Sequence, residues 1–175
     1  MKFLTFLLII LLVLVYRPLA QADGYKSFRI NQIGLEAGIK KSAFGNLFRI
    51  GISKHLTDKA HVKFAPFLEK CDVKKSRLSS MGADLGLSYI IYPISDNLRL
   101  NCSGGITGNY DEVENFSTST SRTLNAGIWG GVEIERSLTD QILLLATGNQ
   151  RLLLKSNMGR QRYDYGIGIK IILND

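Results

Sequence analysis

Residues Arg162–Leu173 read RYDYGIGIKIIL, and in this run large apolar side chains alternate with small or polar ones. Every second residue from Tyr163 to Leu173 is aromatic or aliphatic, whereas the residues between them are an aspartate, two glycines, a lysine and one isoleucine. Because successive side chains of a strand point to opposite faces of a sheet, this alternation predicts a β-strand with one apolar face.

The same alternation recurs along the chain, interrupted by three similar breaks at Leu56–Asp58, Ile94–Asp96 and Leu138–Asp140. Each break places Thr or Ser before Asp, and both side chains can bond back to nearby backbone in a turn. The sequence therefore predicts a series of hairpins. The predicted strands are Ile33–Lys40, Asn46–His55, Ala60–Lys70, Met81–Pro93, Leu98–Tyr110, Leu124–Ser137, Gln141–Leu153 and Arg162–Leu173.

Short and long connections alternate between these strands. The three Thr/Ser-Asp turns are tight, whereas Cys71–Ser80, Asp111–Thr123 and Leu154–Gln161 are long and polar; Lys41–Gly45 is the short exception. Short periplasmic turns and longer outer loops are typical of membrane barrels, and most of the strands are long enough to cross a bilayer when tilted. We therefore predict an all-β fold, an eight-stranded antiparallel up-and-down barrel of the outer-membrane type. Periodicity alone leaves open a water-soluble barrel whose apolar face points inward.

The N-terminus resembles a secretory signal peptide. Lys2 is followed by the apolar run Phe3–Val15, which is shorter than the ~20 residues of a membrane-spanning helix, and Pro18 then interrupts the run. Small residues place the cleavage site after Ala22, with cleavage after Ala20 as the alternative. The predicted division is a signal peptide over residues 1–22 and a β-barrel domain over residues 23–175.

The polar face of the predicted strands carries many charges, which a narrow barrel would enclose. An eight-stranded barrel is about wide enough for its own side chains, and buried charges are tolerated when they are paired. We expect a charge-neutralised plug; a gated polar path is the alternative. The predicted interior network consists of Glu36, Arg49, Asp84, Arg99, Glu133, Glu135, Arg151, Asp164 and Lys170.

Candidate catalytic and metal-binding residues are few. His55 and His61 flank the first tight turn and could form a metal pair with Asp58, but structural and catalytic zinc sites use three or four ligands, so we expect two residues near the periplasmic rim. Cys71 and Cys102 lie at opposite ends of their predicted strands, which argues against a disulfide. We predict no catalytic residue, no cofactor and no metal, and hence no enzyme.

The predicted outer loops are mostly basic. Their lysines and arginines could bridge lipopolysaccharide phosphates, with ordinary solvated charge as the alternative. Direct contact with nucleic acid is not expected, because no aromatic residues interleave with these charges. The third loop is acidic at Asp111, Glu112 and Glu114, which we interpret as a solvated loop, and it is followed by a run of Ser and Thr. The candidate basic contacts are Lys40, Lys41, Lys74, Lys75, Arg77, Lys155 and Arg160.

Seven short motifs follow one another along the chain: Gly34–Gly38, Gly104–Tyr110, Asn125–Gly127, Glu133–Glu135, Leu138–Ile142, Asn149–Arg151 and Tyr165–Lys170. Together they resemble a known family, the conjugal transfer protein TraO of conjugative transposons. The family's usual pattern differs at the final strand, which ends here in aliphatic residues, and at the first outer loop, which is short. The resemblance implies a role in the mating apparatus and supplies no catalytic residues.

The leading functional hypothesis is a structural outer-membrane barrel of a Gram-negative cell that associates with other proteins of a conjugative DNA-transfer apparatus. The alternative is a general outer-membrane structural or adhesion barrel unrelated to conjugation. A lipid-modifying enzyme would need a nucleophile beside a base near the outer rim, and the predicted outer loops contain serines but no histidine. The sequence leaves the oligomeric state open.

Overall fold

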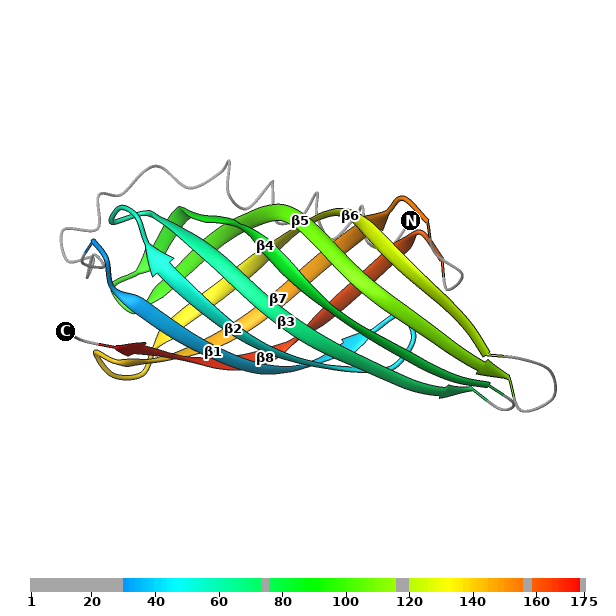
Figure 1. Ribbon diagram of the computed structural model, residues 1–175. Helices are drawn as coiled ribbons and strands as arrows, with labels where there is room; N and C mark the ends of the chain where they lie inside the picture. Colours follow the sequence, from blue (N-terminus) through cyan, green and yellow to red (C-terminus); the bar gives the residue numbers. More distant parts are fainter. Residues whose placement is uncertain (1–29, 74–75, 116–119, 156–158, 174–175) are drawn as a thin grey trace, which may run out of the picture.

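The computed structural model describes residues 30–73, 76–115, 120–155 and 159–173, and these form a closed antiparallel barrel (Figure 1). Each strand pairs with the next along the chain, and β1 closes the barrel by pairing with β8. The prediction of an eight-stranded up-and-down barrel is confirmed. The strands are β1 (Ile33–Ser42), β2 (Asn46–His55), β3 (Ala60–Val73), β4 (Ser76–Ser95), β5 (Leu98–Asn115), β6 (Thr120–Ser137), β7 (Ile142–Leu153) and β8 (Gln161–Leu173).

The strands are staggered around the barrel. Following paired residues from Lys41 through β2, β3, β4 and β5 leads to Arg122 on β6. Following them in the other direction, through β8 and β7, leads to Val132 on the same strand. In general, such a stagger goes with strands tilted by ~35–45° to the barrel axis. Figure 1 shows that the strands run obliquely around the barrel.

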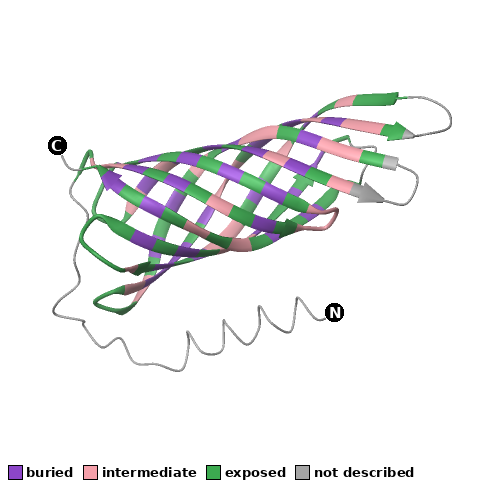
Figure 2. Cartoon of the chain, turned by 90° about the horizontal axis from the view of Figure 1, so that it is seen from below, coloured by how far each residue is buried: buried purple, intermediate pink, exposed green. Residues whose placement is uncertain are grey.

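Buried and exposed residues alternate along every strand (Figure 2). On β8 the tyrosines and isoleucines of the odd-numbered positions are exposed, whereas Asp164 and Lys170 are buried. The apolar face therefore points outward and the polar face points into the barrel. This excludes the soluble alternative with an apolar interior, because the largest fully buried side chains include Lys170, two histidines and several carboxylates.

The tight turns owe their shape to threonine hydroxyls. In the first turn the hydroxyl of Thr57 accepts hydrogen bonds from the backbone N–H groups of Lys59 and Ala60, at 3.2 and 2.9 Å. Thr139 repeats this arrangement with the two residues that follow Asp140, at 3.3 and 3.0 Å. The repeated Thr-Asp motif thus forms repeated turns, as predicted.

Strands β3, β4, β5 and β6 are longer at their outer ends than predicted by three to five residues, and β1 and β8 by one or two. Most of the expected loops Cys71–Ser80 and Asp111–Thr123 are strand, because β3 pairs with β4 as far as Val73, and β5 pairs with β6 as far as Thr120. The outward positions there are charged or polar, and the few apolar residues, such as Leu78 and Val113, lie on the opposite face, so the alternation differs from that of the predicted strands. Pairing to neighbouring strands decides the structure. We call residues 70–73, 76–79, 112–115 and 120–123 the outer extension, which projects beyond the ends of β1, β2, β7 and β8 (Figure 1).

Within the described ranges, no helix is long and apolar enough to cross a membrane. The predicted signal peptide, residues 1–22, lies outside those ranges, so the predicted cleavage site stays a prediction.

Candidate functional site

The barrel interior carries a balanced set of charges. Among the described residues, seven acidic and seven basic side chains are buried. All nine residues of the predicted interior network are among them, and five more come from positions that sequence reasoning placed elsewhere or did not single out. The additional residues are Lys40, Lys63, Glu69, Asp111 and Arg162.

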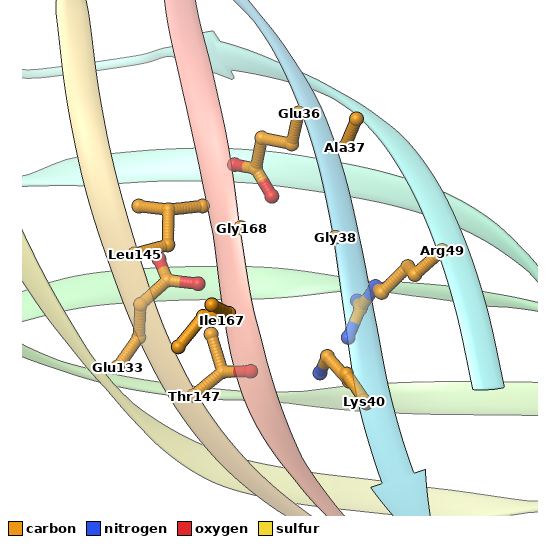
Figure 3. Close-up of a pocket in the computed structure, with 10 residues that line it drawn as sticks. All are labelled: Glu36, Ala37, Gly38, Lys40, Arg49, Glu133, Leu145, Thr147, Ile167 and Gly168. Carbon is orange, nitrogen blue, oxygen red and sulfur yellow. The ribbon is translucent and has the colours of Figure 1, made fainter. Parts of the chain in front are cut away.

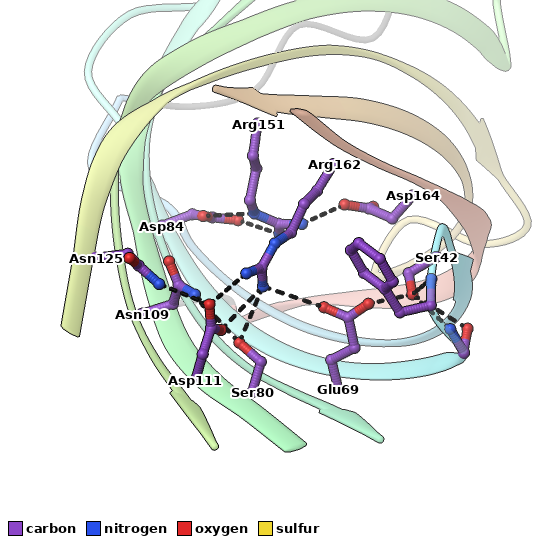
Figure 4. Close-up of polar contacts among 12 residues, drawn as sticks. Ser42, Glu69, Ser80, Asp84, Asn109, Asp111, Asn125, Arg151, Arg162 and Asp164 are labelled. Carbon is purple, nitrogen blue, oxygen red and sulfur yellow. Dashed lines mark hydrogen bonds and ion pairs between the residues drawn. The ribbon is translucent and has the colours of Figure 1, made fainter. Parts of the chain in front are cut away.

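The outer cluster lies at the loop end and centres on Asp111 and Arg162 (Figure 4). The guanidinium of Arg162 donates to both carboxylate oxygens of Asp111, in one case at 3.0 Å. Asn109 and Asn125 donate to the same carboxylate at 2.7 and 2.6 Å. Glu69 lies 3.9 Å from Arg162, so the single cation is held between two carboxylates.

The middle cluster centres on Arg151, which joins Asp84 on β4 to Asp164 on β8 across the barrel. Its guanidinium contacts Asp84 at 2.7 and 3.2 Å and Asp164 at 2.5 Å. Lys40 donates to Asp164 at 2.8 Å, and Arg49 lies 3.5 Å from Asp84. These contacts tie strands from opposite walls together, which stiffens the barrel and obstructs its axis.

The turn-side cluster lies nearer the tight turns and is held by two lysines. Lys63 contacts Glu36 and Glu133, each at 3.0 Å. Lys170 contacts Glu135 at 2.9 Å and Glu36 at 3.5 Å. Two cations thus serve three carboxylates, and Arg99 completes the balance 3.5 Å from Glu135.

Both histidines lie beside the first tight turn, as predicted, but their side chains point into the barrel. His55 and His61 have no exposed surface, and their ring centroids are 4.8 Å apart. Atoms of His61, Glu36 and Glu133 lie within 4.8 Å of one another, a spacing that a metal ion could use. The ammonium of Lys63 already bridges the two carboxylates, however, so these residues are neutralised by a lysine.

Two predicted outer-loop assignments are wrong. Lys40 was assigned as a basic contact at the first outer loop, but it is buried on the inward face of β1 with Glu36 and pairs with Asp164. Asp111 was expected in a solvated loop, but β5 continues through it and turns it inward to Arg162. The inward side of Asp111 could have been predicted by continuing the strand alternation past the predicted end of the strand, because Asp111 has the same parity as Asn109.

The remaining predicted basic contacts divide into two groups. Lys41, Arg77, Lys155 and Arg160 are exposed at the loop end, as predicted. Lys74 and Lys75 lie outside the described ranges.

A small cavity lies in the interior beside Gly38 and Gly168 (Figure 3). Its volume is about 20 Å³, which suits roughly one water molecule. Charged groups of Glu36, Lys40 and Arg49 face it. The space exists because two glycines meet on neighbouring strands, and it is too small for an organic ligand.

The cysteines lie far apart in the fold and are free thiols. Cys71 lies in the outer extension, on β3, and Cys102 lies near the turn end of β5, where it is exposed on the outward face. This placement agrees with the predicted separation along the strands.

The fold is shared with solved outer-membrane barrels at low sequence identity. The N-terminal β-barrel domain of Pseudomonas aeruginosa OprF is 21% identical, with a TM-score of 0.65, over 82% of this chain and 98% of that chain. The outer membrane protein OprG of Pseudomonas aeruginosa is 12% identical, with a TM-score of 0.63, over 86% and 100%. Ail, the attachment invasion locus protein of Yersinia pestis, is 9% identical, with a TM-score of 0.57, over 83% and 100%. These similarities establish the fold.

No curated protein matches the chain significantly. A family model does match, over a part of the chain that begins at Asp111, near the end of β5, and includes all of β6, β7 and β8. Five of the motifs that carry the sequence resemblance lie in this part. Residues 111–173 match the family of the conjugative transposon protein TraO, which confirms the resemblance found in the sequence.

Proposed function

We propose that this protein is a structural component of a conjugative DNA-transfer apparatus, embedded in the outer membrane by its β-barrel. The observation that carries the proposal is the match of residues 111–173 to the TraO family. The matched segment contributes Asp111, Arg151, Arg162 and Asp164, so it contains much of the outer and middle clusters.

Membrane insertion is supported by the outward face of the barrel. Ile106, Ile128 and Ile167 are 61%, 58% and 66% exposed, a pattern that would be costly in water and is favourable against lipid. A row of paired outward residues, Leu68, Met81, Tyr110 and Leu124, ends this apolar face at the loop end. The next outward row begins the outer extension and is polar: Lys70, Ser79, Glu112 and Arg122. We place the lipid border between these two rows.

A structural role, and not conduction or catalysis, is supported by the filled interior. Arg151, Arg162 and Lys63 cross-link opposite walls at three levels, and a transported solute would have to break these pairs. Both histidines of the chain lie near the tight turns, away from the outer-end serines Ser79 and Ser80. Neither histidine therefore lies beside a serine at the outer rim, where it could act as a general base.

The partners we propose are outer-membrane lipid, with lipopolysaccharide phosphates at the exposed basic residues, and other proteins of the transfer apparatus. Charge-assisted hydrogen bonds from lysine and arginine suit phosphate oxygens. Substituting Lys41 and Arg160 by glutamine should weaken retention on lipopolysaccharide-coated beads and leave the barrel folded.

The decisive test is deletion of the gene from its element followed by measurement of the transfer frequency. We expect transfer to fall sharply and to return when the gene is supplied in trans. Unchanged transfer would refute the role in conjugation and favour a general structural or adhesion barrel. A parallel membrane fractionation tests the location separately, because an outer-membrane barrel should appear in that fraction and migrate faster on a gel when unheated.

A further inference from the structure

The outer extension has an open strand edge. On β6, pairing to β7 begins at Gly127, and the last backbone contact on this side within the described ranges is the carbonyl of Ala126, which accepts from Leu154 at 2.8 Å. Beyond it, β6 continues to Thr120, and among the described residues it pairs with β5 alone. About six residues, or ~20 Å of strand, therefore have a neighbour on one side only.

The alternation of the backbone determines which groups face this edge. Since Ala126 faces β7, the N–H and C=O groups of Leu124, Arg122 and Thr120 face the same side, whereas Thr123 and Asn125 bond toward β5. The side chain of Leu124 is 79% exposed beside them. The edge thus offers a regular row of donors and acceptors next to an apolar residue.

Proteins usually protect such an edge with proline, a bulge or an outward-pointing charge. The segment Thr120–Asn125 reads TSRTLN and contains no proline or glycine. Its one charged residue, Arg122, is held by Glu112 of β5 at 2.8 Å, so the guanidinium leans back over the sheet and away from the edge. Within the described residues, this edge therefore has no proline, no bulge and no charge pointing across it.

We propose that this edge accepts an extended segment of another protein as an additional antiparallel or parallel strand. Extended polypeptide is the chemistry that matches a row of backbone donors and acceptors at strand spacing. The segment would place an apolar residue beside Leu124 and polar residues beside Ser121 and Thr123. The inference uses the described backbone alone and does not depend on the role in conjugation.

A second copy of this chain is a poor fit to the same edge. If two copies stood side by side in one membrane with their β6 edges paired, β7 of each barrel would occupy the space where the lower part of the other β6 would run. An incoming strand from a different protein meets no such obstacle, because it can lie above the end of β7 at Leu153.

The test uses the purified full chain, folded in detergent micelles, and a fluorescent synthetic peptide of alternating valine and threonine with one glutamate, about eight residues long to span the edge. Fluorescence anisotropy measures binding. Leu124→Pro removes one edge N–H and no bond to β5, and Leu124→Ala is the matched control that keeps the N–H. We expect saturable binding that Leu124→Pro weakens about tenfold and Leu124→Ala changes much less.

A second peptide, N-methylated at every other residue, should not bind, because it cannot form the ladder. Unheated gel migration checks that each variant is folded. The proposal is overturned if no peptide binds to the folded chain, if Leu124→Pro and Leu124→Ala bind equally, or if the unmodified chain pairs through Leu124 with itself.

Discussion

Strands β3 to β6 run from the barrel wall into the outer extension, but the polarity of their inward and outward faces is reversed between the two regions. In the wall, outward residues such as Leu85 and Ile106 are apolar, and inward residues such as Asp84 are charged. In the outer extension, Glu112 and Arg122 point outward, and Leu78 and Val113 point toward the axis. The reversal occurs along β4, β5 and β6 without a break in the strand.

This difference shows that the surroundings, and not the strand, decide which face is apolar. In the wall, lipid favours an apolar exterior, and the buried charges are tolerated because each has a partner. In the outer extension, where we place water outside, charged side chains return to the outer face. An ion pair in the wall should therefore contribute much more to the free energy of unfolding than an ion pair in the outer extension. Unfolding of matched variants measures this difference.

The largest effect is expected from breaking the middle cluster. Arg151→Met leaves Asp84 and Asp164 buried without their shared guanidinium, and removal of one partner of a buried pair costs about 3–5 kcal/mol. The midpoint of urea unfolding in detergent micelles should fall strongly. The matched change in the outer extension, Arg122→Met, removes an exposed pair with Glu112 and should leave the midpoint unchanged. Equal losses from both variants would contradict the comparison.

A smaller effect tests the lipid border. Leu85→Lys places a charge on the outward face of the wall, where an outer-membrane barrel loses about 2–4 kcal/mol near the bilayer midplane. Ser79→Lys makes the same face charged six positions earlier on β4, beyond the proposed border, and should be tolerated. Folding into lipid vesicles, followed by gel mobility, compares the two. If Ser79→Lys also prevents folding, the border lies further out than the row at Met81.

The wall could be predicted from the sequence because its two faces differ strongly in polarity. Alternation in Arg162–Leu173 and in the strand around Leu85 gave the strand count, the up-and-down order and the inward side of Asp84, Glu133 and Lys170. The three Thr/Ser-Asp motifs predicted which end of the barrel carries the tight turns. These features are local, so one sequence was sufficient.

The outer ends and the pairing of the interior could not be predicted in this way. In Asp111–Thr123 both faces contain polar residues, so the loss of apolar contrast resembled a loop although the strands remain paired. Which carboxylate meets which cation depends on the stagger of the whole barrel, since Asp84 and Arg151 come from strands on opposite walls. The inward side of Lys40 follows from its parity with Glu36, yet its position at the strand end made a loop residue the simpler interpretation.

The smallest expected effect on stability comes from adding a methyl group on the inward face of the wall, compared with adding one on the outward face. A methyl group added to Gly86 would meet the carbonyl oxygen of Gly104 and the ring of Trp129, the latter at 2.8 Å, because β4 and β5 are packed against a filled interior. Gly148 lies on the outward parity of β7 and has no atom within 4 Å of such a methyl group. Overpacking of this kind costs about 1–3 kcal/mol, so Gly86→Ala should lower the urea midpoint and Gly148→Ala should not. If the two variants unfold alike, the interior beside Trp129 has room to adjust, and the case for a filled barrel that ties its walls together would weaken.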